Sequence, residues 1–249
     1  GLYILLALGL IFSCLSFLSQ SRFMAIKEII ITGNNRAKTD MILAKALREM
    51  SGNYFYFFSK ENIFLYPAHR IREKIIALPL IQSVDIERKS LTKIEIKIEE
   101  RKEDARFCDG ATMETNLCFS LDENGLIFDR VATSTAFVYR GLISSPSLGQ
   151  SFLRTEEFKK IQFFIRELGS LGLVPIEALF DIDEPHYMTV VLFTGGRLII
   201  NTNDDLAIVL SNLSSIMRDK TVVPTISSFL KKLDYMKLDS KNKIVYKLK

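Results

Sequence analysis

The chain has 249 residues, of which 48% are hydrophobic and 25% are charged, and its formal net charge is +4. These values are typical of an ordinary globular protein with enough chain to bury one large or two small cores. Acidic and basic residues are interleaved, and the sequence contains no basic arm and no aromatic–basic motif for stacking bases. This pattern argues against a dedicated nucleic-acid surface.

The first 21 residues carry no charge and are mostly Leu, Ile and Phe. A bilayer core needs about 20 mainly apolar helical residues, so we predict a transmembrane helix in residues 1–21, with residues 2–18 in the membrane. The alternative is a cleaved signal peptide, because Ser19-Gln20-Ser21 is a small-x-small triplet. Both interpretations export the rest of the chain. Because the sequence starts with Gly, we expect an upstream segment whose charge would set the orientation.

Three cysteines are present. Cys14 lies in the apolar segment, where we expect it to act as a small hydrophobe. Cys108 and Cys118 flank a polar loop, and a disulfide between them is plausible in an oxidising compartment. Such a bond would stabilise the fold by roughly 2–3 kcal/mol. Two unpaired buried thiols remain the alternative, and no Cys or His spacing suggests a metal site.

Residues 25–101 read as a compact α+β unit. A strand over residues 26–32 ends at Gly33-Asn34-Asn35, and Thr39 is expected to cap a helix that ends near Gly52. A second helix starts at Pro67 and ends before Pro79. Two strands follow with alternating apolar and charged residues, around residues 84–87 and 93–99. We interpret the aromatic run over residues 54–58 as a plug of the core between elements.

The sequence pattern of residues 102–249 predicts a mixed, β-rich domain with two helices. Asn124-Gly125 indicates a hairpin. Helices are expected after caps at Thr155 and Asn203. Further strands are predicted in this region over residues 174–182, 187–193, 197–200, 232–238 and 243–248. We expect no long linker, low-complexity segment or repeat.

The sequence contains no recognisable catalytic or cofactor motif. His69 and His186 are isolated, and no nucleophile elbow or phosphate-binding glycine loop is present. Asp181, Asp183 and Glu184 suggest a cation site at first, but the spacing of an EF-hand is missing. A polar loop is the better interpretation. We therefore expect a protein that is not an enzyme, with no cofactor, metal or small-molecule substrate.

With these elements placed, nearly the whole chain resembles the FtsQ/DivIB family of cell-division proteins. The strand Ile29–Asn34 is similar to the opening of the family's POTRA domain, with its Gly-Asn turn. The passages Leu78–Arg88 and Leu91–Arg101 resemble the two strands that close that domain. Leu121–Phe128 is similar to the hairpin that opens the family's β domain. Near the end, Lys237 and Asp239 stand where family members often have aspartate and arginine.

The resemblance implies a single-pass protein of the cytoplasmic membrane with an extracytoplasmic body, expected at the division septum. Its partners would be small coiled-coil proteins of the FtsB and FtsL type and the septal peptidoglycan machinery. The terminal strand is the candidate edge for β-augmentation. The candidate partner-binding residues are Tyr235, Lys243, Ile244, Val245, Tyr246, Lys247 and Leu248. The alternative is that its lysines only solubilise an ordinary edge, and the second helix and second strand of the POTRA unit offer another site.

Two other function classes remain open. A POTRA protein of polypeptide transport or outer-envelope assembly would need a run of barrel strands, for which too little chain remains. A membrane-anchored hydrolase would need a nucleophile or a metal constellation. Convergence of Asp181, Asp183 and Glu184 on a pocket would support that class.

Overall fold

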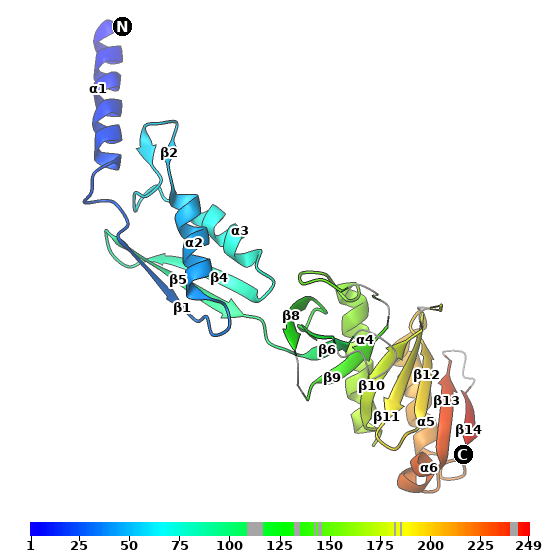
Figure 1. The fold of residues 1–249 in the computed structure, drawn as a ribbon. Helices are drawn as coiled ribbons and strands as arrows, with labels where there is room; N and C mark the ends of the chain where they lie inside the picture. Colours follow the sequence, from blue (N-terminus) through cyan, green and yellow to red (C-terminus); the bar gives the residue numbers. More distant parts are fainter. Residues whose placement is uncertain are drawn as a thin grey trace. The chain divides into compact units, whose positions relative to one another are not determined.

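The computed structural model describes residues 1–108, 117–131, 135–141, 143, 146–181, 183–184, 186–239 and 244–249. The chain divides into two compact units, residues 1–101 and residues 102–249. Each unit has its own buried core. The fold is therefore a mixed α+β architecture in which an N-terminal apolar helix precedes a small sheet domain and a larger, β-rich domain (Figure 1).

The first unit begins with helix α1, Leu2–Ser19, which is long and apolar enough to cross a membrane. Almost all of its side chains are exposed in the structure, and no charged residue occurs in it. An apolar helix that the protein itself leaves uncovered is what a bilayer would bury. The predicted membrane segment is therefore one continuous helix.

After α1, the first unit forms a three-stranded sheet with two helices on one face (Figure 1). The strand order is β1-β5-β4, and β1 lies parallel to β5 whereas β4 lies antiparallel to it. The apolar residues of the alternating strands join those of the helices in one core, which includes Ile42, Ile71 and Ile96. The elements are β1 (Glu28–Thr32), α2 (Thr39–Met50), α3 (Ala68–Ile76), β4 (Ile81–Arg88) and β5 (Lys93–Glu100).

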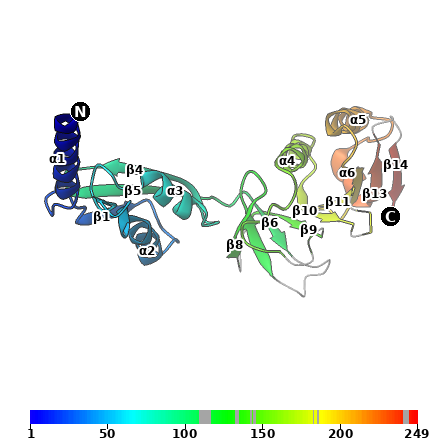
Figure 2. The ribbon, with the colours of Figure 1, turned by 90° about the horizontal axis from the view of Figure 1, so that it is seen from above.

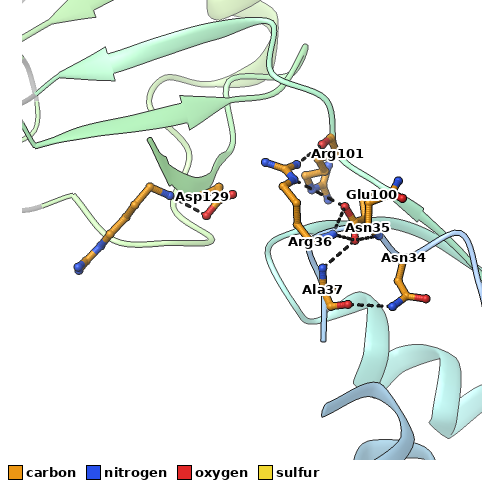
Figure 3. Close-up of polar contacts among 8 residues, drawn as sticks. Asn34, Asn35, Arg36, Ala37, Glu100, Arg101 and Asp129 are labelled. Carbon is orange, nitrogen blue, oxygen red and sulfur yellow. Dashed lines mark hydrogen bonds and ion pairs between the residues drawn. The ribbon is translucent and has the colours of Figure 1, made fainter. Parts of the chain in front are cut away.

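The carboxylate of Glu100 fixes the turn that follows β1 (Figure 3). Its Oε1 atom accepts hydrogen bonds from the backbone N–H groups of Asn35 and Ala37, each 2.8 Å long, and from that of Arg36 at 2.9 Å. Its side chain is 8% exposed. Burial alone would raise the pKa of Glu100, but these hydrogen bonds outweigh burial and hold the pKa below its usual value. Glu100, at the end of β5, thus fixes the turn that connects β1 to α2.

The aromatic run is not a core plug, so that prediction is wrong. Residues 53–59 form an additional small hairpin, β2 (Asn53–Tyr54) and β3 (Phe58–Ser59), with Phe55 and Tyr56 at its tip. Phe55 is 84% exposed and Tyr56 is 91% exposed. The expectation failed because a run of large apolar residues usually marks burial, whereas here the chain turns back between them.

The second unit is built on one nine-stranded sheet, in the order β14-β13-β12-β11-β10-β9-β6-β7-β8. Most neighbours are antiparallel, but β6 with β9, β9 with β10 and β12 with β13 are parallel pairs. The strands are β6 (Ala105–Cys108), β7 (Cys118–Leu121), β8 (Ile127–Val131), β9 (Phe137–Arg140), β10 (Pro175–Phe180), β11 (Tyr187–Leu192), β12 (Arg197–Asn201), β13 (Leu233–Leu238) and β14 (Ile244–Leu248).

Helices cover one face of this sheet and close the core. Helices α4 (Thr155–Ser170) and α5 (Leu206–Arg218) lie on the same side of it (Figure 2). Their buried residues, such as Phe158 and Val209, share one cluster with inward-facing strand residues. A third helix, α6 (Ile226–Lys232), leads directly into β13. The sequence predicted two helices here, because α6 is too short to show a helical period.

Three predicted helix caps are wrong by one or two residues. Thr39 and Thr155 are the first residues of their helices, and neither acts as a cap. At α5 the cap is Asp205 and not Asn203. The side chain of Asp205 accepts hydrogen bonds from the N–H groups of Ala207 and Ile208. Several residues near a helix start can cap, so the sequence alone does not select among them.

Cys108 and Cys118 are joined by a disulfide in the structure. They are register partners at the ends of the antiparallel strands β6 and β7. The bond closes the segment between those strands, most of which lies outside the described residues. The third cysteine, Cys14, is free and exposed on α1.

Candidate partner-binding edge

Strand β14 ends the nine-stranded sheet, and among the described residues only β13 pairs with it. The two strands are antiparallel, with Met236 opposite Tyr246 and Leu238 opposite Ile244. The side of β14 that faces away from β13 therefore presents backbone N–H and C=O groups without a strand partner in the described parts of the chain. An unpaired edge of this kind is a template for an incoming strand.

The backbone of β14 can be assigned to its two sides. The N–H of Lys249 donates a hydrogen bond of 2.7 Å to the carbonyl of Lys232, on the β13 side. Because the N–H groups of successive strand residues point alternately to opposite sides, those of Lys247 and Val245 also point to β13. The N–H and C=O groups of Tyr246 and Leu248 therefore point to the open edge.

The side chains of β14 divide between the two faces of the sheet. On the helix-covered face, Tyr246 meets Phe229 of α6 with ring centroids 5.7 Å apart, and Ile244 packs against the core of the second unit. On the opposite face lie Val245 and Lys247, and Val245 is 59% exposed. This edge therefore combines exposed apolar surface with backbone groups that have no strand partner among the described residues.

The carboxylate of Asp234 forms ion pairs with two cations near this edge. Asp234 sits in a bulge of β13, where the register with β14 shifts between Leu233 and Tyr235. Its carboxylate lies 2.7 Å from Arg197 and 3.8 Å from Lys247. The hydrogen bond from Arg197 holds the pKa of Asp234 below its usual value, and the charges of Lys247 and Lys249 act in the same direction. Lys247 is thus already close to one anion of its own chain.

The structure brings most of the predicted partner-binding residues together. Tyr235 is the register partner of Lys247, so it lies beside β14 on the face opposite the helices, and not on the open edge itself. Ile244, Val245, Tyr246, Lys247 and Leu248 all belong to β14. Lys243 lies outside the described residues. No local sequence signal indicates Phe229, Asp234 or Arg197. Arg197 reaches Asp234 because β12 and β13 pair in parallel, and Phe229 reaches Tyr246 from α6.

The predicted alternative edge in the first unit is also a sheet edge. Strand β4 ends the three-stranded sheet, and helix α3 lies next to it. Arg72 of α3 donates a hydrogen bond of 3.1 Å to the carbonyl of Val84 in β4. This edge is more charged than β14 and carries an ion pair between Arg72 and Asp85.

The acidic loop of the second unit makes local hydrogen bonds. Asp181 accepts from the backbone N–H groups of Asp183 and Glu184, and all three residues are exposed. This is a turn held by an aspartate side chain. Within the part of the chain that the structure describes, no group of three His, Cys, Asp or Glu residues is placed to hold a metal ion. His69 is exposed, with Nδ1 3.5 Å from the Glu73 carboxylate.

Comparison with known proteins identifies the first unit. Residues 24–101 match the family model described as POTRA domain, FtsQ-type. A search of curated proteins finds no match for the chain. The FtsQ-type POTRA family is one of non-enzymatic scaffolds. The matched residues contain the whole three-stranded sheet and its two helices, and α1 precedes them directly. Residues 24–101 thus form an FtsQ-type POTRA domain behind an N-terminal apolar helix, and this arrangement supports an FtsQ/DivIB-like protein.

Proposed function

We propose that this protein is a non-enzymatic scaffold of bacterial cell division. It is anchored by α1 in the cytoplasmic membrane, with its body outside the cytoplasm and concentrated at the septum. There it binds small single-pass coiled-coil proteins of the FtsB and FtsL type and supports assembly of the septal peptidoglycan machinery. The FtsQ-type POTRA domain supports the division role. The open edge of β14 is the observation that supports binding of a partner strand.

The chemistry of binding is β-augmentation. A partner segment adds to β14 as a further strand and pairs with the outward backbone groups of Tyr246 and Leu248. The exposed Val245 gives the incoming strand an apolar contact on the face opposite the helices. The lysines at 247 and 249 favour an acidic segment and disfavour pairing of two copies of β14.

Two substitutions at one position isolate the backbone contribution. Tyr246→Ala and Tyr246→Pro both remove the ring that meets Phe229. Only Tyr246→Pro also removes the N–H that points to the open edge. Proline is tolerated at an edge strand where its nitrogen faces solvent, so both variants should fold. The full chain and both variants are immobilised, and solubilised membrane proteins of the source organism are passed over them.

We expect mass spectrometry to find small coiled-coil membrane proteins on the wild type and on Tyr246→Ala, and to find them lost from Tyr246→Pro. Equal retention by all three chains would keep the scaffold and place the binding site elsewhere, with β4 as the next candidate. If the folded wild type retains no such protein, the division function is wrong. Retention of outer-envelope assembly components instead would favour the transport alternative.

A further inference from the structure

The hairpin of residues 53–59 is docked against the membrane helix. The hydroxyl of Ser16 donates a hydrogen bond of 2.8 Å to the carbonyl of Phe57, and the side-chain amide of Gln20 donates one of 3.0 Å to the same oxygen. The backbone N–H of Ser59 donates a hydrogen bond of 3.2 Å to the hydroxyl of Ser19. These contacts fix the hairpin to the last two turns of α1.

Aromatic contacts extend this docking further along α1. The ring of Phe12 lies 5.3 Å from that of Phe57 and 5.4 Å from that of Phe58, both in edge-to-face geometry. From Phe12 to Gln20 the helix rises by about 12 Å, at about 1.5 Å per residue. The hairpin lies beside this half of α1 (Figure 1). If the apolar residues of α1 lie in hydrocarbon, the hairpin is carried to the membrane surface with them.

The free side of the hairpin has the composition of a membrane interface. Residues 53–59 contain no charged side chain and five consecutive aromatic rings. Phe55 is 84% exposed and Tyr56 is 91% exposed, and Phe23, in the turn after α1, is 84% exposed. Tyrosine is enriched where a bilayer meets water, because its ring is apolar and its hydroxyl is polar.

A cation lies at the base of this apolar surface. The ammonium of Lys60, which follows the hairpin in the chain, lies 5.6 Å from the ring of Tyr54. Lys and Arg at the end of an apolar segment extend their charges towards the headgroups while their stems stay in the apolar layer. The hairpin thus has an apolar tip and a cationic base.

The tip of the hairpin has a strained backbone. The turn is closed by a hydrogen bond of 3.0 Å from the N–H of Phe57 to the carbonyl of Tyr54. Its two central residues, Phe55 and Tyr56, have φ angles of 48° and 68°. Glycine or asparagine normally occupies such positions, and a bulky residue there is a true outlier. The folding of the hairpin in water does not explain two large rings at its most strained and most exposed point.

We propose that the hairpin of residues 53–59 inserts its tip, Phe55 and Tyr56, into the interface of the same membrane that α1 spans. The lipid is the occupant of this surface, since the hairpin is already held on the membrane helix and its free side has no charge to pair with a protein. This second attachment limits rotation of the POTRA domain about the end of α1. The inference depends on α1 spanning the membrane and not on the division function.

The chain contains no tryptophan, so a single introduced one reports on its own surroundings. The full chain is prepared as Phe55→Trp and, separately, as Tyr56→Trp, and reconstituted into vesicles of phosphatidylcholine and phosphatidylglycerol. Matched vesicles carry bromine on the acyl chains, which quenches only rings in contact with lipid. Leu6→Trp on α1 is the positive control. Phe193→Trp, at a turn of the second unit and 78% exposed, is the control for an exposed aromatic residue.

We expect both tip variants to emit at shorter wavelength than Phe193→Trp and to be quenched by brominated lipid, as Leu6→Trp is. Long-wavelength emission that acrylamide quenches and brominated lipid does not would overturn the proposal. Short-wavelength emission without bromine quenching would also overturn it, because a protein surface would then cover the tip. If Leu6→Trp itself escapes bromine quenching, α1 does not span the membrane and the proposal fails with it.

Discussion

Arg197 donates a hydrogen bond of 2.7 Å to the carboxylate of Asp234, which links β12 to the bulge of β13. This contact places one negative charge beside the cations of the β14 edge. If the partner strand is acidic, as proposed, Asp234 repels it during approach.

We therefore expect Asp234→Asn to increase the association rate of the captured partner at low salt, with little change at high salt, where such charges are screened. Surface plasmon resonance at two ionic strengths would measure this difference. Asp183→Asn is the matched control, because it makes the same change of charge at an exposed residue of the acidic loop. An equal increase in both variants would mean that net charge, and not the β14 edge, controls the association rate.

The carboxylate of Glu100 should make the stability of the POTRA domain depend on pH. Its pKa is lowered in the folded state, so its contribution is fully present above the unfolded value of about 4.3. The contribution is lost as the pH falls below that value and through the lower folded pKa. We expect Glu100→Gln to lower the free energy of unfolding at pH 7 by about 1–2 kcal/mol, since a neutral acceptor binds three N–H groups less strongly.

Hydrogen exchange of peptides from β1 and α2 in the full chain would measure this loss, and the gap between wild type and Glu100→Gln should narrow below about pH 4. Glu99→Gln removes the same charge from an exposed neighbour that accepts a hydrogen bond from Ser83. That control should change stability far less. A gap that persists unchanged at low pH would contradict the assigned role of the Glu100 charge.

The regular parts of this fold were predictable from local sequence. The alternation in residues 93–99 predicted β5, because one face of that strand is buried and the other is in water. The Asn124-Gly125 turn likewise predicted the hairpin of β7 and β8. These elements can be predicted from local sequence because strand alternation and turn type depend on residues that are close together in the chain.

The long-range parts were not predictable in the same way. No local pattern indicates that β9 pairs in parallel with both β6 and β10, so that all strands of the second unit join one sheet. The candidate site shows the same division. The terminal strand was readable from residues 243–248, but the position of Asp234 between Arg197 and Lys247 depends on the order of three strands.

Two glycines with similar backbone angles allow strain and crowding to be separated. Gly33 has a φ of +85° and Gly52 a φ of +83°. An added Cβ at Gly33 would lie 2.0 Å from the carbonyl oxygen of Ile98, whereas at Gly52 it would meet nothing within 4 Å. Gly52→Ala should therefore destabilise the domain by about 1 kcal/mol, the cost of a left-handed residue.

Gly33→Ala should cost about 3 kcal/mol or more, because the β5 backbone must also shift. Urea unfolding of the full chain, followed by hydrogen exchange of peptides from β1 and β5, would compare the two variants. Equal destabilisation would show that the close approach of Gly33 to Ile98 is not maintained in solution.

The bond between Cys108 and Cys118 can be tested by counting alkylated thiols with mass spectrometry. The chain has three cysteines, and Cys14 is the free one in the structure. Alkylation of the denatured chain without reductant should therefore add one group, and alkylation after reduction should add three. Three groups without reductant would mean that the two cysteines are thiols in the isolated protein.

Loss of this disulfide should also lower stability. Its cysteines are separated by 10 residues, and closing so short a loop stabilises the folded state by about 3 kcal/mol in the chain-entropy model. We expect the double variant Cys108→Ser and Cys118→Ser to unfold at lower urea concentration in the second unit, with no change in the POTRA domain. Cys14→Ser is the matched control. Added reductant should destabilise the second unit of the wild type and leave the double variant unaffected, because only the wild type has a bond to break.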